Sequence, residues 1–406
     1  MIARIHPPDK HKGRMKNEIR NASRKQTLAL VRSAVRQRHE EMVGLMRMLV
    51  ETESPSNDKA AVDRCMEVAA AACRKVGGRV RWHRQRRFGD VLEAHFGFAP
   101  TSLARPLLLL GHLDTVWPLG TLDGMPFRRK HGRIWGPGVL DMKAGVAMAL
   151  TALGILKEEH FPSQPITLLL NSEEEIGSPI SRPVTERLAR ECAAVYVLEP
   201  GQGLNGAYKT ARKGTGDFTL RVRGVAAHAG VDFSNGHSAV LELARQLVKI
   251  SEFTDMDCGL TVNPGVIGGG TLANVIAAEA WAKVDFRFAK ASDAKKIERK
   301  FRALRPINQR CSVEVTGGVN RPPMERTRAT VALFARAATF AAELGFELRE
   351  AATGGGSDGN FTSAIGVPTL DGMGAVGEGA HAANESILIE DLANRTALLA
   401  AMMMNE

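Results

Sequence analysis

Three short apolar runs, separated by helical patterns, restrict the possible fold more than any other feature of this 406-residue sequence. The runs cover residues 106–111, 166–171 and 195–198, and none contains a charged side chain. A strand without polar alternation is typical of a parallel sheet that is covered on both faces. Apolar residues at helical spacing predict helices over residues 142–158 and 182–191, between the runs. This alternation predicts an α/β fold: a mixed, mainly parallel sheet flanked by helices.

The pattern of the chain changes near residue 213. Residues 215–222 alternate polar and apolar side chains as a half-exposed strand does, and the order strand-helix-strand-strand-helix-strand follows from there. We expect this order to form a ferredoxin-like α+β unit inserted into the α/β domain. Its predicted elements are 215–222, 238–250, 259–267, 279–288, 291–304 and 312–315.

The rest of the chain continues the α/β style on both sides of the insertion. Helices are predicted over residues 26–53 and 58–76, strands near 79–83 and 90–96, and further elements at 329–344, 359–365, 368–370 and 389–404. The predicted organisation is a basic N-terminal tail (1–26), the first part of the α/β domain (27–211), the inserted unit (212–322) and the second part of the α/β domain (323–406).

The excess positive charge lies mostly at the N-terminus. The sequence carries 54 Lys and Arg against 44 Asp and Glu, and residues 1–26 alone hold eight basic and two acidic side chains. Aromatic residues make up only 5% and no basic helix is interleaved with stacking residues, so the remainder of the chain gives little support for nucleic-acid recognition. We therefore expect no nucleic-acid partner and a solvated tail, to which any such role would be confined.

Neither export nor membrane insertion is predicted. No apolar run has signal-peptide length near the N-terminus, and none approaches about 18 uncharged residues elsewhere. The five cysteines are odd in number and show no CxxC spacing, which argues against disulfide and thiolate-zinc frameworks. We expect a protein of the reducing cytoplasm with no membrane partner.

The first apolar run ends in GHLDT, which places His112 and Asp114 at the carboxyl end of a strand. Because side chains alternate along a strand, both project to the same side. One can bind a metal ion while the other accepts the remaining imidazole N–H, a pairing that fixes the tautomer needed for ligation. A hydrogen-bonded His–Asp pair in a surface loop is the alternative.

Asp141 lies where the glycine-punctuated segment GPGVLDMKAG enters a helix. A dinucleotide-binding GxGxxG motif is excluded, because it requires glycine at position 141 and a strand directly before it. A carboxylate at such a turn can reach two metal ions with its two oxygens. A plain helix N-cap is the commoner use of an aspartate there.

Adjacent carboxylates follow the second apolar run, in NSEEEIGS. Glu173, Glu174 and Glu175 repel one another unless cations or solvent neutralise them. On an exposed helix such a run is usually a solvated face, but here it ends a core strand, which favours a functional role. Glu199 follows the third run in the same way, with an ordinary acid at a strand end as the alternative.

His381, in GEGAHAANE, precedes the last predicted helix from within a glycine-rich loop. A single histidine indicates nothing, but this one completes a set of imidazole and carboxylate side chains near the ends of predicted elements. Oxygen and imidazole donors without thiolate suit zinc, cobalt or manganese in an open catalytic site. The set comprises His112, Asp141, Glu174, Glu175, Glu199 and His381.

The motifs resemble, in order and spacing, those of the acetylornithine deacetylase, succinyl-diaminopimelate desuccinylase and carboxypeptidase G family of di-zinc hydrolases. They are GHLDTV, GPGVLDMKAG, the EExGS portion of NSEEEIGS, LEPG, TGGGSDG and GAHAANE. The resemblance covers about residue 27 to the C-terminus, and glutamate carboxypeptidase is the most similar type. It implies a zinc aminopeptidase-like catalytic domain, an inserted dimerisation and lid domain, and hence a homodimer.

The resemblance also implies roles for the candidate residues. Two metal ions about 3.5 to 4 Å apart can together activate a water and polarise a carbonyl. Glu174 resembles the general base, which passes a proton from the water to the leaving amine, and the pattern Glu-Glu-x-Gly selects it over Glu173. The implied zinc ligands are His112 and Glu199 for one ion, Glu175 and His381 for the other, and Asp141 for both, with Asp114 orienting His112.

Residues of the inserted unit match the family as well. His228, in AHAG, resembles a histidine that reaches into the partner subunit's active site and steadies an oxyanion. Asn274, in GGTLAN, resembles a second polar contact. Arg287 and Arg321 lie where carboxypeptidase G-like members hold substrate carboxylates, for which the planar fork of arginine is suited. Without the resemblance, a capping histidine, a turn asparagine and surface arginines would explain them.

The glycine-rich segment TGGGSDG contains Gly355 and Gly356. It lacks the Lys-Ser/Thr of a phosphate-binding P-loop. The resemblance implies that its backbone approaches the substrate, where only glycine leaves room.

Together these features predict a homodimeric amide hydrolase with two Zn²⁺ ions, or Co²⁺ or Mn²⁺ in their place. It is expected to release an acidic, glutamate-like C-terminal amino acid from a small N-acyl or short peptide substrate. The alternatives are an N-acyl-amino-acid deacylase with another side-chain preference and a catalytically silent binding homologue.

Overall fold

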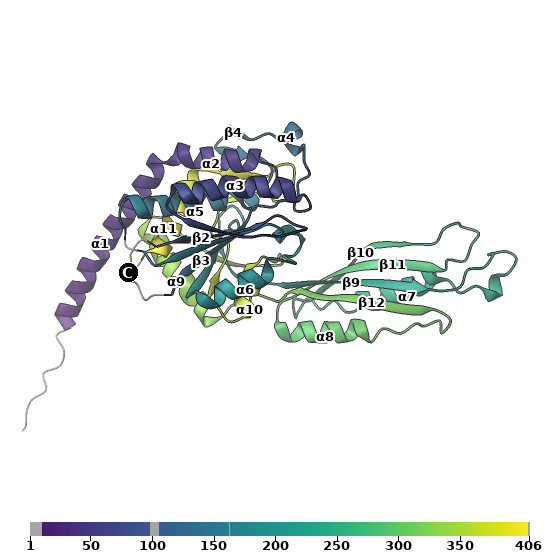
Figure 1. Cartoon of the computed structure of the whole chain (residues 1–406). Helices are drawn as coiled ribbons and strands as arrows, with labels where there is room; N and C mark the ends of the chain where they lie inside the picture. The colour runs from purple at the N-terminus through teal and green to yellow at the C-terminus, as the bar shows by residue number, and fades with distance from the viewer. Residues whose placement is uncertain (1–9, 98–104, 162, 405–406) are drawn as a thin grey trace, which may run out of the picture.

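A six-stranded mixed sheet forms the centre of the larger of two units (Figure 1). The structure, a computed structural model, describes residues 10–97, 105–161 and 163–404, with the side chains of residues 10–23 excepted. Three strand pairs are parallel and two, at one edge, are antiparallel, which confirms the predicted mixed, mainly parallel sheet. Its strands are, in spatial order, β1 (Arg79–His83), β2 (Val91–Phe96), β6 (Ile166–Asn171), β3 (Leu107–His112), β7 (Ala194–Val197) and β14 (Thr369–Leu370).

Helices cover both faces of this sheet. On one face α5 and α11 form the main core, with α1, α2, α3 and α9 packed around them, and α6 and α10 lie on the other face (Figure 1). The strands β3 and β6 are buried along their whole length, as their unbroken apolar sequences require. The helices are α1 (Lys10–Gln37), α2 (His39–Glu51), α3 (Lys59–Lys75), α5 (Ala144–Glu158), α6 (Arg182–Glu191), α9 (Arg328–Glu343), α10 (Gly359–Ala364) and α11 (Ile389–Met403).

The core helix α5 is apolar on all sides because other elements surround it. The helical segment Val139–Glu158 is long and apolar enough to cross a membrane by length and composition. However, 89% of its most apolar window is buried inside the protein. This burial accounts for its composition.

The N-terminal segment differs from the prediction in two ways. Helix α1 begins at Lys10, inside the predicted basic tail, and Arg24 forms an ion pair with Glu343 of α9. Lys and Arg are good helix formers, so a helix anchored by the packing of Leu28 propagates toward the N-terminus at little cost. The predicted helix over 26–53 is divided at Arg38, because α1 packs on α11 while α2 packs on α5. Residues 1–9 of the predicted tail lie outside the described residues.

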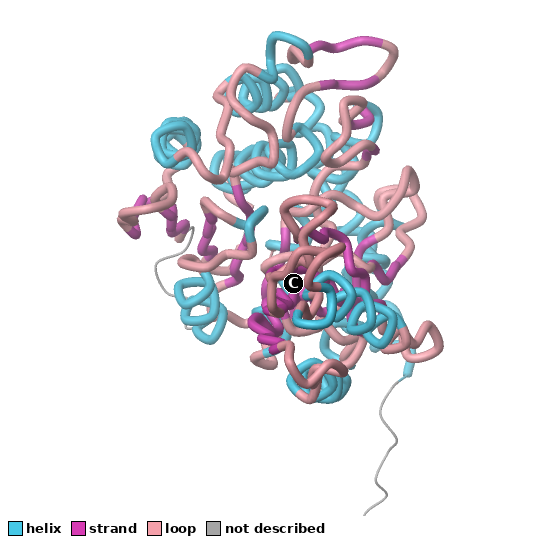
Figure 2. Tube along the Cα trace, turned by 90° about the vertical axis from the view of Figure 1, so that its right-hand side faces the viewer, coloured by secondary structure: helices cyan, strands magenta, loops and turns pink. Residues whose placement is uncertain are grey.

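The second unit projects from the first and has its own core (Figure 1). Its four-stranded antiparallel sheet has the order β10-β11-β9-β12 and carries α7 and α8 on one face, and in Figure 2 it points toward the viewer. Alternate residues of β9 and β11 are buried under the helices, where Phe218 stacks on Phe286 and Phe301. The elements are β9 (Gly214–Arg223), α7 (Ala239–Ser251), β10 (Thr261–Gly269), β11 (Glu279–Phe288), α8 (Ala291–Arg302) and β12 (Ser312–Arg321). They have the predicted order and lie within 212–322.

Strand β12 is much longer than the predicted 312–315. It continues through Gly317 and Gly318, which have positive φ values of 112° and 159°, because pairing with β9 persists to Arg321. A glycine pair weakens a strand and, in isolation, predicts its end. Here the pairing with β9 continues through both glycines and keeps the strand extended. The extension carries Asn320 and Arg321 back to the larger unit, where Asn320 Nδ2 donates to the carbonyl of Gly177.

Two small sheets were not indicated by the sequence pattern. One has the order β15-β16-β5-β4, and the other pairs β8 with β13 in parallel. Their strands are short, so they contribute no readable periodicity. The elements are β4 (Arg128–Lys130), β5 (Arg133–Trp135), β8 (Tyr208–Arg212), β13 (Glu350–Thr353), β15 (Gly377–Glu378), β16 (Ser386–Leu388) and the short helix α4 (Thr121–Gly124).

Candidate active site

The carboxyl ends of three neighbouring strands supply most of the site. His112 is the last residue of β3, Glu174 and Glu175 lie in a short 3-10 turn after β6, and Glu199 follows β7. Because β6, β3 and β7 are adjacent and parallel, their carboxyl ends meet at one edge of the sheet. The spatial order of these strands in the sheet therefore brings together side chains that are far apart in the sequence.

The four-stranded small sheet positions the remaining two residues. Asp141 lies in the π-helical turn Val139–Lys143, which follows the loop after β5 and leads into α5, and His381 lies in the loop between β15 and β16. Since β5 pairs with β16, Trp135 lies opposite Ser386 and the two loops start side by side. His381 has φ 62°, a left-handed conformation that directs the loop back toward Asp141.

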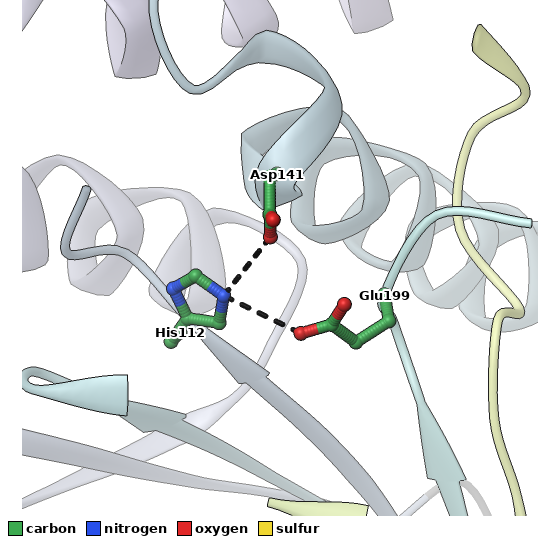
Figure 3. A group of neighbouring side chains, drawn as sticks. All are labelled: His112, Asp141 and Glu199. Carbon is green, nitrogen blue, oxygen red and sulfur yellow. Dashed lines mark ion pairs between the residues drawn. The ribbon is translucent and has the colours of Figure 1, made fainter. Parts of the chain in front are cut away.

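The first group of ligating atoms joins His112, Asp141 and Glu199 (Figure 3). Nε2 of His112 lies 3.3 Å from Oδ1 of Asp141 and 3.6 Å from Oε1 of Glu199. The imidazole is almost fully buried, with 1% of its side chain exposed. It points from the end of β3 into the space between the two carboxylates (Figure 3).

The second group joins Asp141, Glu175 and His381. Nε2 of His381 lies 3.1 Å from Oε2 of Glu175 and 3.4 Å from Oδ2 of Asp141. Half of the His381 side chain is exposed, whereas only 7% of that of Glu175 is. Asp141 thus contributes one oxygen to each group, and the second group opens to solvent.

The donor atoms fit metal ions. Two ligands held tetrahedrally at about 2.0 to 2.2 Å from one ion lie about 3.3 to 3.6 Å apart, and the four separations between histidine nitrogens and carboxylate oxygens fall in or near that range. His112 Nε2 and Asp141 Oδ1 are buried without a hydrogen-bond partner among the described residues. Buried polar atoms are nearly always satisfied, so a cation between these two atoms would complete their coordination.

Burial and neighbouring charges shift the pKa values of the candidate ligands. Burial lowers the pKa of His112, but the carboxylates of Asp114, Asp141 and Glu199 together raise it well above the ordinary value. Burial raises the pKa of Glu175 to about 7. Metal ligands must give up their protons on binding, so binding here is coupled to pH.

Asp114 organises both the histidine and the glutamate turn. Its Oδ1 lies 3.3 Å from Nδ1 of His112, and its backbone carbonyl is 3.0 Å from the same nitrogen. Its two carboxylate oxygens accept the backbone N–H groups of Glu174 and Glu175, both at 3.1 Å. Asp114 therefore lies where the predicted orienting residue should, and it also fixes the turn that presents Glu174.

Glu174 lies beside the first group without belonging to it. Its Oε2 is 3.9 Å from Nε2 of His112, and its Oε1 accepts a hydrogen bond of 2.7 Å from Arg321 Nη2. Burial raises the pKa of Glu174 well above its ordinary value, although Arg321 and His112 lower it. A carboxylate whose pKa is raised by burial binds a proton more readily than a free carboxylate does, which suits a general base.

Glu173 is held away from both groups. Its Oε1 accepts the backbone N–H groups of Ile180 and Ser181, and its Oε2 accepts from the hydroxyl of Ser172. Its role is to shape the loop that follows the glutamates. The structure thus separates the three adjacent carboxylates into a loop residue, a candidate base and a candidate ligand.

Arg321 lies in the site, and protein groups already accept hydrogen bonds from both Nη1 and Nη2 of its guanidinium, while Nε is buried without a hydrogen-bond partner among the described residues. Nη2 donates to the Glu174 carboxylate and carbonyl, to Ser178 and to Asp358, the last at 2.8 Å. Burial disfavours its charge, yet Glu174 and Asp358 raise the pKa of Arg321 above the ordinary value. In this conformation Arg321 positions Glu174, and its predicted contact with a substrate carboxylate stays a prediction.

Among the described residues, the other predicted residues of the inserted unit make no hydrogen bond or ion pair with the ligand groups of the same chain. Arg287 pairs with Asp285 of its own strand, at 2.9 Å. His228 is exposed, and its Nδ1 accepts the backbone N–H groups of Gly230 and Val231. Asn274 lies beside this loop and accepts the N–H of Ala229 through its carbonyl.

The glycine-rich loop is bound by a residue that sequence reasoning missed. The carbonyls of Gly355 and Gly356 each accept a hydrogen bond of 3.1 Å from Nη1 of Arg212. A Cβ at Gly356 would lie 2.9 Å from Cδ of Arg321, so glycine is required there by packing. Arg212 is buried and also bonds Asp371 and, at 3.2 Å, Oε2 of Glu199. No motif in the sequence marks it.

The model of peptidase family M20/M25/M40 matches residues 108–405. This chain belongs to that family. The predicted resemblance is thereby confirmed, and the protein is a hydrolase of amide bonds in a family of metallopeptidases with carboxypeptidase-like members.

Similar proteins include carboxypeptidase G2 from Pseudomonas sp. (strain RS-16), which is 29% identical over 306 residues, or 74% of this chain and 73% of that protein. Succinyl-diaminopimelate desuccinylase from Delftia acidovorans is 30% identical over 319 residues, covering 72% of this chain and 79% of that protein. The crystal structure of aminopeptidase PepT from Bacillus cereus has the same fold, with a TM-score of 0.75 at 23% identity over 90% of this chain and 98% of that chain.

Proposed function

We propose that this M20-family protein is a di-zinc carboxypeptidase that releases an acidic, glutamate-like residue from a small N-acyl amino acid or short peptide. The observation that supports it most is the pair of ligand groups that share Asp141, with donor separations suited to metal ions. Metal ions held there would supply Lewis-acid polarisation of the scissile carbonyl and lower the pKa of the attacking water.

The chain's own residues would move the proton. Oε1 of Glu174 is fixed by Arg321, which leaves Oε2 facing His112 and available to the attacking water. Glu174 would take the proton at Oε2 and return it to the leaving nitrogen. Asp114 contacts both His112 and the backbone of the glutamate turn, so it would keep these two groups in fixed positions relative to each other during the proton transfer.

The preference for an acidic residue rests on two arginines. Arg287 is about one-third exposed and bonds Asp285 of its own strand, and Arg321 reaches the site itself. Because Glu174 and Asp358 already accept hydrogen bonds from Nη2 of Arg321, the structure also supports a second candidate: an N-acyl-amino-acid deacylase that accepts another side chain.

A substrate panel separates these two candidates. We expect kcat/KM for N-acyl-glutamate and N-acyl-aspartate to exceed that for N-acyl-leucine. Replacing Arg287 with Met should remove this difference while leaving hydrolysis of the leucine compound intact. Equal or higher kcat/KM for N-acyl-leucine would refute the acidic preference and favour the deacylase. No hydrolysis of any compound by the metal-loaded protein would refute both.

We further propose a homodimer in which His228 acts in the partner's site. Thr215 of β9 pairs with Arg321, and the strand then runs eight residues to Arg223, which is about 26 Å at roughly 3.3 Å per residue. His228 lies beyond that point, too far to serve its own chain's site. In the proposed dimer, the projecting unit (Figure 1) would present His228 to the partner's site.

Mixing two inactive variants tests this arrangement. Refolding Glu174→Gln and His228→Ala chains together gives dimers of which half are mixed, and each mixed dimer has one complete site if His228 acts in the partner. Activity should therefore return to about a quarter of the wild-type value. No recovery of activity, or a monomer in analytical ultracentrifugation, would contradict the proposal.

We also propose a cytoplasmic location without nucleic-acid or membrane partners. All five cysteines are free, which suits a reducing compartment. Cell fractionation with the activity assay as readout tests the location, and activity recovered from membranes or from the medium would contradict it.

A further inference from the structure

Glu385 is a buried carboxylate that lies next to the ligand groups without being part of them. Its side chain accepts four hydrogen bonds. Oε1 accepts from the backbone N–H groups of Leu140 (2.8 Å) and Asp141 (3.1 Å), and Oε2 accepts from the N–H of Gly138 (2.9 Å) and from the indole of Trp117 (2.9 Å). The acceptor capacity of a carboxylate is thereby filled by four donors.

Three of these donors belong to the turn that presents Asp141. Gly138 begins the turn with φ 71°, and a Cβ there would meet Thr115 at 2.5 Å. The side-chain oxygens of Asp141 reach both ligand groups, so a small rotation of this turn would misplace a ligand in both. Glu385 is the carboxylate on which the N–H groups of the turn converge.

Glu385 also belongs to the loop that presents His381, four residues earlier. The segment from Gly379 to Glu385 is closed by bonds from Ala382 N to Gly379 O and from Glu385 N to Ala382 O. One side chain therefore links the loop of His381 to the turn of Asp141, the two ligand-bearing segments that the central sheet does not carry.

We propose that Glu385 is a positioning residue: it fixes Asp141 between the two ligand groups and holds the loop of His381 in register with it. The inference rests on the proposed metal-dependent function. Partners that orient metal ligands from outside typically change metal affinity or activity by about 10- to 100-fold when lost.

The variant Glu385→Gln tests this role with little change in volume. Glutamine has one acceptor oxygen and one NH₂ group, so two of the four donors would face another donor. We expect the apparent Zn²⁺ affinity, measured by competition with a chromophoric chelator, to fall about 10- to 100-fold. The visible absorption spectrum of the Co²⁺-loaded variant should differ from that of the wild type, and kcat should fall while KM stays unchanged.

Glu242→Gln is the matched control. Glu242 is a buried carboxylate of the inserted unit that likewise accepts backbone N–H groups, from Ile307 and Asn308. Its replacement should destabilise the fold to a similar extent but leave the Zn²⁺ affinity and the Co²⁺ spectrum at wild-type values. An equal loss of affinity in both variants would show a general effect of destabilisation and overturn the proposal.

Wild-type affinity, spectrum and kcat in a folded Glu385→Gln variant would also overturn it. If circular dichroism shows that this variant does not fold, Trp117→Phe decides, since it removes one donor from a half-buried position. We then expect a shifted Co²⁺ spectrum and a lower kcat at unchanged KM, and unchanged values refute the proposal. A wild-type protein that binds metal but hydrolyses no panel substrate contradicts the proposed function alone, and the affinity comparison still decides on Glu385.

Discussion

Replacement of Glu174 by glutamine separates the movement of the proton from the binding of metal. The amide oxygen can still accept from Nη2 of Arg321, as Oε1 does at 2.7 Å, so the side chain should keep its place. What is lost is the basic oxygen that faces His112 from 3.9 Å. Glu174 is not a member of either ligand group, and metal should therefore remain bound.

The expected magnitude follows from these contacts. A positioned general base contributes about 10²- to 10⁴-fold to the rate, which corresponds to about 3 to 5 kcal/mol of activation free energy. The hydrogen bond to Arg321 changes from a charged to a neutral acceptor, which costs about 1 kcal/mol of folding stability. We thus expect kcat to fall by at least about 10²-fold, with a native circular dichroism spectrum.

The assay combines steady-state kinetics on N-acyl-glutamate with metal analysis of the same sample. Glu378→Gln serves as control, because Glu378 is a half-exposed residue that pairs with Arg133 and touches neither group. It should behave as the wild type. A Glu174→Gln variant with undiminished kcat would refute the assignment of the base, and one that has lost its metal would show that Glu174 is a ligand.

Three further predictions concern pH, charge and packing. Asp141 and Glu175 raise the pKa of His381 to about 10, so below that pH at least one proton must leave as metal binds. The apparent Zn²⁺ affinity should therefore rise at least about tenfold per pH unit between pH 6 and 8, and a pH-independent affinity in chelator competition would contradict this. Replacing Arg212 with Met leaves the buried carboxylates of Glu199 and Asp371 without their shared cation. This should lower the free energy of unfolding by about 3 to 5 kcal/mol, and an unchanged denaturation midpoint would contradict it. Leu168→Ala removes a fully buried side chain from the central sheet and should lower the free energy of unfolding by about 2 to 5 kcal/mol in the same assay. A loss under about 1 kcal/mol would mean that the core around Leu168 is loosely packed.

The central sheet could be predicted because its buried strands have unbroken apolar sequences. Residues 107–110 are four leucines, buried at 2% exposure or less between helices on both faces. Such runs indicate parallel strands, and the carboxyl ends of parallel strands lie at one edge. The strand pattern therefore predicts that His112, Glu175 and Glu199 lie near one another.

The loops of Asp141 and His381 could not be placed by the same reasoning. They are carried by β5, β15 and β16, which are strands of two or three residues. The pairing of β5 with β16 joins segments about 250 residues apart. So short a strand has no period to read. Their positions were implied by motif resemblance alone, which gives residue identity without the pairing that holds it.

Arg321 shows why a residue type does not determine its partner. Arginine suits a substrate carboxylate, and it suits the carboxylates of Glu174 and Asp358 equally well. These lie 147 and 37 residues away in the sequence, and they reach Arg321 because β12 continues past its two glycines. The sequence around Gly317 indicates a strand end, and only the pairing with β9 overrides it.

We propose that five side chains from separate segments form one dinuclear metal centre, in which Asp141 would offer one oxygen to each ion. The most direct measurement is an anomalous difference map, recorded at the zinc absorption edge, from crystals of the zinc-loaded protein. We expect two peaks about 3.5 to 4 Å apart, one beside His112 and Glu199 and one beside Glu175 and His381, with Asp141 touching both. A single peak, or peaks that do not contact Asp141, would contradict it.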